Sequence, residues 1–354
     1  MTHGVTAPSP GAVFACAIAF PIVCTIAVGT KFQSRRASKS QLVIDDWLTL
    51  PALVSVIAMG IALVIGVACK GLGYATPQPP ASNENLTFIA PQTILTRKVE
   101  YAVELLQFPA LTCTKLSLLF FYKRIFCTPW RRLLRAVFSV LIAICILWGL
   151  GFLSSMALIC GRHVPAFWGP VKELKTHCPG LHDQEIWLVC TDLVIDVLIF
   201  LVPIPLVVRL EMAFVRKVAV MVIFLFAIIT VAASLTRMII FLRAISSLKE
   251  KYNSSGHDNL IITAGLYWTM FEAGMGLIVV CLPSHYMLAQ TMWKSWFSKD
   301  MEEVDVNEYI TSNRESEQQR PEVSESQRRL EDAAKRGLFL TRADTETTTS
   351  STYS

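Results

Sequence analysis

The sequence predicts an all-α fold, a bundle of seven transmembrane helices followed by a polar tail. Hydrophobic residues make up 53% of the 354 residues and charged residues only 17%, whereas soluble domains carry about 25% charged residues. Apolar runs of about 20 residues, the length that crosses a bilayer, recur as far as residue 287. This composition excludes a single-anchor enzyme, a disordered chain and a nucleic-acid-binding domain.

Seven apolar segments, separated by charged or Gly- and Pro-rich stretches, define the expected spans. They are residues 11–30, 47–69, 100–122, 136–160, 186–208, 218–242 and 260–287. Each must be helical, because a lone strand would leave its backbone N–H and C=O groups unpaired in lipid. We therefore expect a short outer N-terminus (1–10), a membrane domain (11–296) and a disordered cytoplasmic tail (297–354).

Charges flanking the first two segments predict the orientation. Residues 1–10 contain no Lys or Arg, and a cationic cluster follows the first segment: Lys31, Arg35, Arg36 and Lys39. That order indicates a retained helix with its N-terminus outside, not a cleaved signal sequence. The loops placed inside carry more Lys and Arg than those outside, as the positive-inside rule requires. Two sequons, at Asn85 and Asn253, fall in loops placed outside and are candidate glycosylation sites.

The third segment is polar along one face. It carries Glu104, Lys115 and Tyr122, which return to nearly the same azimuth at 100° per residue. A charge at mid-bilayer costs at least about 2.5–3.5 kcal/mol, so such groups normally face the bundle interior and have partners. This segment should therefore lie in the interior of the bundle.

Ionisable residues of later segments offer partners to this face. Asp192 and Asp196 lie four residues apart on the fifth segment, Arg237 lies in the sixth and Glu272 near the middle of the seventh. We predict an interior cluster in which Lys115 pairs with Asp196 or Glu272. Such a cluster forms a ligand pocket or a conformational lock, or it only holds the register of the helices. The candidate residues are Glu104, Lys115, Asp192, Asp196, Arg237 and Glu272.

Two cysteines bracket the loop after the fourth segment. Cys160 and Cys178 are predicted to face the oxidising side, where disulfides persist. A bond between them would fold this loop across the outer face, and the alternative is two unpaired thiols at helix ends. No Cys or His spacing indicates a metal site, and no cofactor is expected.

The cytoplasmic regions suggest partners. Residues 123–135 place five cations beside the inner leaflet, which attraction to anionic lipid explains by itself. With the tail, this second inner loop is also a candidate surface for a cytoplasmic signalling partner. The tail is too polar to form a core, but residues 324–340 are expected to form a short helix.

Several strings resemble the fungal rhodopsin-domain family. This family of seven-helix integral membrane proteins includes the satratoxin-cluster membrane protein and Pth-type receptor-like proteins. The resemblance covers roughly residues 12–295, and the Cys, Trp, Cys pattern around the fourth loop also resembles the family. The chain departs from the family pattern at Tyr74-Ala75 and at Ser284-His285. The strings are DDWLTLPALV, GLG, TKLSLLFFYKRIF, DLVIDVLIFLVPIPLVVRLEMAFVRKVAV, SLTRM and FEAGMGLIVVCLP.

The resemblance and the residues together suggest two functions. Retinal requires a lysine in the seventh segment, and residues 260–287 contain none, so no retinal is expected. Scattered histidines and the lack of a nucleophile motif argue against an enzyme. The first function is receptor-like sensing of a small molecule at the plasma membrane or an endomembrane. The alternative is an accessory membrane protein of a secondary-metabolite cluster that moves or retains a product.

Overall fold

The computed structural model of the chain describes its helical body and one short helix of the tail. The described residues are 8–37, 41–74, 91–126, 132–161, 163–169, 171–178, 180–202, 204, 225, 228–240, 242, 260, 262–285 and 328–335. All regular elements among them are helical, which confirms the all-α class. Residues 290–354 form a separate unit, in which residues 328–335 are helical within the segment expected to form a helix.

The helices follow the predicted segments in order. They are α1 (Pro10–Ala37), α2 (Ile44–Trp47), α3 (Thr49–Ala68), α4 (Pro91–Phe126), α5 (Arg132–Leu158), η1 (Val164–Trp168), α6 (Val171–His177) and α7 (Leu181–Leu201). Two further helices, Ile228–Ile240 and Ile262–His285, lie at the positions of the sixth and seventh predicted segments.

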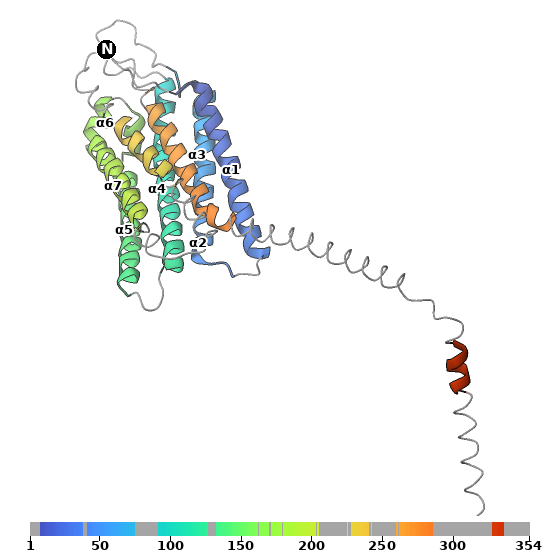
Figure 1. Ribbon diagram of the computed structural model, residues 1–354. Coiled ribbons are helices and arrows are strands. Elements are labelled where there is room, and N and C mark those ends of the chain that lie inside the picture. The colour runs from blue at the N-terminus through green and yellow to red at the C-terminus, as the bar shows by residue number, and fades with distance from the viewer. Residues whose placement is uncertain are drawn as a thin grey trace, which may run out of the picture. The chain divides into compact units, whose positions relative to one another are not determined.

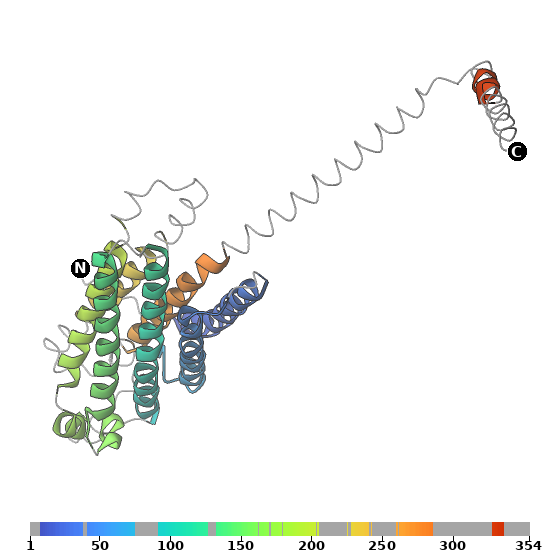
Figure 2. The same cartoon turned by 90° about the horizontal axis from the view of Figure 1, so that it is seen from below.

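The long helices run side by side, with α4 in the middle. Figure 1 shows α1 and α3 along one flank and α5 and α7 along the other, and α4 packs against α2, α3, α5, α7 and η1. The view in Figure 2 confirms that α1 and α3 are neighbours and that α5 lies beside α4. The short helices α2 and α6 lie at opposite ends of this bundle (Figure 1), which we call the α2 end and the α6 end.

Within the part of the chain that the structure describes, five helices are long and apolar enough to cross a membrane: Pro10–Ala37, Ile44–Ala68, Pro91–Ile125, Arg132–Leu158 and Ile262–His285. The protein is therefore a multi-pass membrane protein. The helix α7 carries four acidic residues and Ile228–Ile240 is short, so neither meets the same requirement. Spanning by these two, and with it a count of seven, stays a prediction.

Several helix bounds differ from those predicted, and the differences place additional charged residues inside helices. The first helix continues to Ala37 instead of ending at residue 30, so Lys31 and Arg35 belong to the helix and are buried. The prediction that they lie in the loop after the first segment was wrong. The helix α7 begins at Leu181, not at residue 186, and so includes Glu185.

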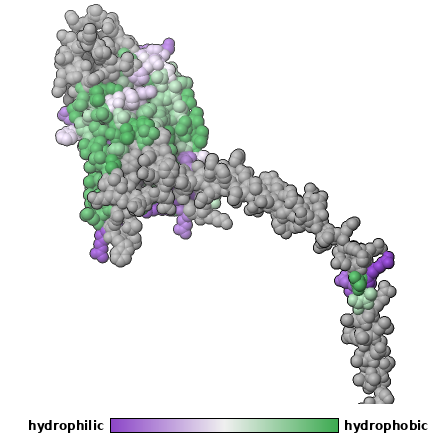
Figure 3. Space-filling view, viewed as in Figure 1, coloured by the Kyte–Doolittle hydropathy of each residue, from purple (hydrophilic) through white to green (hydrophobic). Residues whose placement is uncertain are grey.

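The surface of the bundle is apolar where lipid would contact it. Figure 3 shows a largely hydrophobic flank, with hydrophilic residues toward its two ends. Large apolar side chains such as Val54, Leu147 and Leu158 are 65%, 71% and 69% exposed. Because monomeric soluble proteins rarely expose continuous apolar surface of this extent, this flank supports a membrane location.

Glycines let neighbouring helices approach closely. A Cβ placed on Gly60 of α3 would lie 2.6 Å from the backbone oxygen of Ala17 in α1, and one on Gly149 of α5 would overlap the Thr112 side chain of α4. Small residues at such contacts are typical of membrane helix packing. This packing sets the lateral positions of the polar side chains in the core.

Candidate functional site

The polar face of α4 meets that of α7 in the centre of the bundle. Lys115 Nζ lies 2.7 Å from Asp192 Oδ1 and 2.6 Å from Asp196 Oδ1. Because the two aspartates are about one helical turn apart, a single ammonium group bridges both. Lys115 also lies 5.4 Å from the centroid of the Trp148 ring of α5, within the range of a cation–π contact.

Arg237 of the helix Ile228–Ile240 supplies a second cation. Its Nη2 lies 3.2 Å from Asp192 Oδ2, and its Nε lies 3.4 Å from Glu272 Oε2 on the helix Ile262–His285. Its Nη1 donates to Gln107 Oε1 of α4 at 3.1 Å. Asp192, which is fully buried, is thus held between two cations. Glu272 pairs with Arg237 and not with Lys115.

Ser234, three residues before Arg237, completes the arrangement. Its Oγ lies 2.7 Å from Asp196 Oδ2 and 2.9 Å from Glu272 Oε1. The contacts therefore form a closed ring in which three carboxyl groups alternate with three donor side chains. Each of the six carboxyl oxygens contacts one donor. We call this set the core ring: Lys115, Asp192, Asp196, Ser234, Arg237 and Glu272.

The core ring joins four helices that are far apart in the sequence. Its members come from α4, α7, Ile228–Ile240 and Ile262–His285, and five of the six are at most 7% exposed. Removing one partner of a buried ion pair costs about 3–5 kcal/mol, because the other charge stays buried without a counter-ion. The ring can therefore hold the four helices in one arrangement.

A small cavity borders the core ring. It has a volume of about 50 Å³ and is lined by Lys115, Asp196, Glu272, Thr114 and Tyr122 among others. Sites for drug-sized molecules are about 300–1,000 Å³, whereas a buried water needs about 10–15 Å³ of such space. The cavity has the size for one or a few waters, and the ring residues that line it are ion-paired or hydrogen-bonded within the ring.

The three acids of the ring lie close enough together to resemble a set of metal ligands. Their carboxyl oxygens lie within 4.8 Å of one another, a spacing that a cation could bridge. However, Lys115 and Arg237 already occupy the cation positions between these oxygens. We assign no metal ligand among them.

Glu104, predicted as part of the cluster, lies outside the core ring. Its side chain is hydrogen-bonded to that of Glu185 on α7, within electrostatic reach of Arg237. A hydrogen bond between two carboxyl groups requires a proton on one of them. Sequence analysis missed Glu185 because the predicted segment began at residue 186. Its spacing of seven residues from Asp192 places both on one helix face, and that signal could have found it.

A second buried ionic cluster lies at the α2 end and was also missed. Lys31 Nζ lies 3.2 Å from Asp46 Oδ1, and Arg35 lies 3.4 Å from Asp45 Oδ2 and 3.2 Å from Asp46 Oδ2. Ser117 of α4 donates to the Asp45 backbone oxygen at 2.6 Å. The cluster ties α1 and α2 to the centre of the bundle. The i, i+4 spacing of the two cations, followed by adjacent aspartates, was a signal for it.

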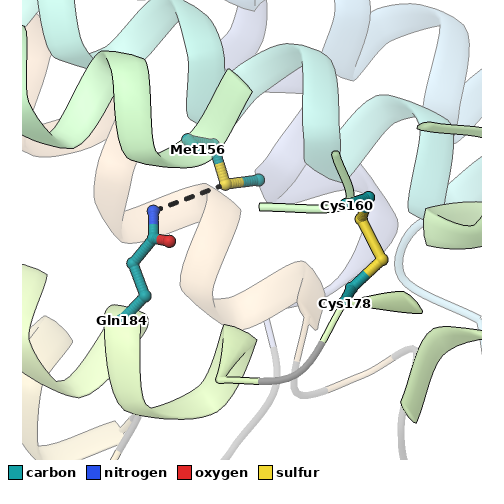
Figure 4. The surroundings of a disulfide bond; sticks show 4 residues. All are labelled: Met156, Cys160, Cys178 and Gln184. Carbon is teal, nitrogen blue, oxygen red and sulfur yellow. Dashed lines mark hydrogen bonds between the residues drawn. A yellow bond between two sulfur atoms is a disulfide. The ribbon is translucent and has the colours of Figure 1, made fainter. Parts of the chain in front are cut away.

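The α6 end carries the disulfide. Cys160 and Cys178 are bonded, joining the turn after α5 to the end of α6 (Figure 4). Between them, η1 packs against α4 through Phe167 and Tyr101, whose ring centroids lie 5.0 Å apart. Of the two alternatives for these cysteines, the structure has the bond, and the loop forms a packed cap.

Other predicted sites cannot be placed. The sequon residues Asn85 and Asn253 lie outside the described residues, as do residues 127–131 of the second inner loop. The remaining cations of that loop, Lys123, Arg124, Arg132 and Arg135, lie at the end of α4 and the start of α5.

The chain shares sequence with fungal membrane proteins. It is 26% identical over 275 residues to the polyenoic acids biosynthesis gene cluster protein Ba17b of Metarhizium anisopliae, an alignment that covers 74% of this chain and 69% of the relative. It is 25% identical over 307 residues to the phomoidride biosynthesis cluster protein H of a fungal species (strain ATCC 74256), covering 80% of this chain and 89% of the relative. No solved structure matches the chain.

The family assignment rests on most of the bundle. The sequence profile described as the fungal rhodopsin domain matches residues 30–291, well over half of the chain. This match includes α2 to α7 and both later helices, and thus every member of the core ring. The resemblance seen in the sequence is confirmed: the chain belongs to the fungal rhodopsin domain family.

Proposed function

We propose that the protein is a non-enzymatic accessory membrane protein of a fungal secondary-metabolite pathway, in which it moves or retains an apolar product. The observation that carries this proposal is the similarity to two proteins named for biosynthetic clusters, each aligned over more than two thirds of both chains. Their alignments extend over most of the membrane domain, so the likeness is not that of one local motif.

The architecture is compatible with an apolar product handled at the membrane. The core of the bundle is occupied by ion-paired side chains, and the cavity beside them is about 50 Å³. The lipid-facing flank, by contrast, offers exposed Leu, Ile and Val side chains. An apolar product would therefore contact this flank from the bilayer, or would enter the bundle only after the core ring opens.

Receptor-like sensing of a small molecule, without retinal, is the second candidate. The core ring favours it, because a set of ion pairs linking four helices can hold one of two arrangements. In this case the second inner loop and the tail would contact a cytoplasmic partner.

For either function we propose seven spans with the N-terminus outside and the C-terminus inside. The disulfide at the α6 end supports an oxidising environment there, and the cations Lys31 and Arg35 lie at the opposite, α2 end. Glycosylation tests this topology: enzymatic removal of N-glycans should shift the mass of the protein. Substituting both Asn85 and Asn253 by Gln should abolish that shift. An unshifted wild-type protein would remove this support for the orientation.

A metabolite comparison distinguishes the two functions. Strains with the gene, without it and with the gene restored would be compared by untargeted mass spectrometry of cells and medium, with cytosolic cyclic AMP and calcium measured in the same cultures. Loss or trapping of one product, with signalling unchanged, supports the accessory role. Unchanged metabolites with a weakened response to an external cue would refute it and support sensing.

Variants keep this comparison specific to the bundle. The deletion strain would also receive Lys115→Met, which opens the core ring, and Asp183→Asn, which changes an exposed acid on α7 outside the ring and the inner loops. The first should fail to restore the phenotype and the second should restore it.

A further inference from the structure

The core ring lacks one hydrogen-bond donor. Ser234 Oγ faces three acceptor oxygens, namely Asp196 Oδ2 at 2.7 Å, Glu272 Oε1 at 2.9 Å and the Thr230 backbone oxygen at 3.0 Å. A serine hydroxyl has one hydrogen to donate, and an ionised carboxylate can only accept. With both carboxyls ionised, this single hydrogen cannot serve both carboxyl oxygens, so at least one of the two serine–carboxyl contacts would have no hydrogen.

The charge of the ring shows the same deficit. Its three carboxyl groups face two cations, so the fully ionised ring carries one uncompensated negative charge in a buried site. An uncompensated buried charge is costly, and a buried acid avoids that cost by keeping its proton. One added proton corrects both the charge and the missing hydrogen bond.

The distances indicate which carboxyl holds that proton. Asp192 contacts both cations, and Asp196 lies 2.6 Å from Lys115 Nζ. Glu272 has only Arg237, at 3.4 Å. Glu272 is the acid least compensated by cations.

We propose that the core ring is a proton-binding site in which Glu272 is protonated and donates to Ser234 Oγ, while Ser234 donates to Asp196. The chain of hydrogen bonds then ends at the ammonium group of Lys115, and the ring is neutral. The bound species is one proton, exchanged with water through the neighbouring cavity, which both Asp196 and Glu272 line. This inference does not depend on the proposed function.

The other titratable groups around the site do not change the net charge of the ring. Lys115 and Tyr122 face the site from α4, and Glu104 lies further toward the α6 end of the same helix. Cys145 faces it from α5, and Arg237 from Ile228–Ile240. Asp192 and Glu185 face it from α7. Glu104 and Glu185 contact each other and are not members of the ring. Tyr122 and Cys145 are uncharged at neutral pH.

Binding of this proton has a conformational consequence. Loss of the proton leaves the ring with a net negative charge and removes the donor from Glu272 to Ser234. Both changes weaken the contact of Ile262–His285 with Ile228–Ile240 and α7. Opening of the bundle is therefore coupled to proton release, and closing is coupled to proton uptake.

Infrared spectroscopy of the purified full chain in lipid nanodiscs tests the proposal. A protonated carboxyl has its own C=O stretching band, which shifts in D₂O and is absent from an ionised carboxylate. Difference spectra at neutral pH would be recorded for Glu272→Gln and Asp196→Asn, in which the neutral amide replaces the acid without loss of shape. The matched control is Asp183→Asn, an exposed acid on α7.

The expected result is loss of one protonated-carboxyl band in Glu272→Gln and no loss in Asp183→Asn. Ser234→Ala should keep this band but shift its frequency, because its hydrogen-bond acceptor is gone. Glu104→Gln should leave this band in place, since Glu104 is not a member of the ring. If Glu272→Gln removes no protonated-carboxyl band, or if Asp196→Asn alone removes one, the proposal is overturned. It is also overturned if the wild-type ring is ionised and the stability of the protein requires added sodium.

Discussion

Replacement of Lys115 by Met tests whether the core ring holds the bundle together. The substitution keeps an unbranched side chain of similar length but removes the ammonium group that bridges Asp192 and Asp196 at 2.7 and 2.6 Å. Asp192 keeps Arg237 at 3.2 Å, whereas Asp196 keeps only the neutral hydroxyl of Ser234. The variant therefore leaves one buried carboxylate without a cation.

The expected loss of stability follows from the contacts that the two aspartates keep. Breaking a buried ion pair by removing one partner costs about 3–5 kcal/mol. Because Asp192 retains a second cation, we expect a loss near the lower limit, about 3 kcal/mol, or roughly a hundredfold in the folding equilibrium constant. The assay is equilibrium unfolding of the purified protein in detergent micelles, followed by tryptophan fluorescence.

Two further variants make the result specific. Lys123→Met changes a lysine near the end of α4 that donates a hydrogen bond to the exposed hydroxyl of Ser139. It should lower stability by less than about 1 kcal/mol. Adding Asp196→Asn to Lys115→Met should recover part of the loss, because the uncompensated carboxylate is gone. A Lys115→Met protein as stable as the Lys123→Met protein, or a double variant whose losses simply add, would refute the reasoning.

Three other substitutions test separate parts of the bundle. Cys160→Ser should make Cys178 alkylatable and lower stability by about 3 kcal/mol; peptide mapping that finds Cys178 already alkylated in the unreduced wild type would exclude the bond. Asp46→Asn should lower stability by about 3 kcal/mol, because two buried cations at the α2 end lose their shared carboxylate, and an unchanged unfolding midpoint would contradict this. Gly149→Leu should lower stability by at least about 1–3 kcal/mol, because the larger side chain forces α5 away from α4. Gly151→Leu places its side chain in open space and should leave stability nearly unchanged. Equal losses in the two variants would show that the close approach of the helices is unimportant.

The sequence alone was sufficient for the fold class and for the general position of the polar core. Length and hydropathy of a segment depend only on its own residues, so helices occur at all seven predicted positions. The spacing of Asp192 and Asp196 is likewise local, because residues four apart share a helix face whatever the neighbouring helices are.

Helix bounds were less predictable where polar residues continue a helix. Hydropathy ended the first segment at residue 30, but α1 continues because Lys31 and Arg35 find buried aspartates on α2. The free-energy cost of burying these two charges is offset by ion pairing with Asp46, which lies more than ten residues away in the sequence. A hydropathy window covers one segment at a time and therefore does not detect such a partner.

The choice of partners was decided by the tertiary structure. The sequence identified Lys115 and several acids as interior groups but left open whether Lys115 meets Asp196 or Glu272. It gave no role to Ser234, a residue that is common and unremarked in membrane helices. The sequence determined that charges would be buried in a helical membrane bundle, because burial follows from composition and helical period. Only the packing of α4, α7 and the two later helices decided which charges meet, because contact depends on the rotation and neighbours of every helix at once.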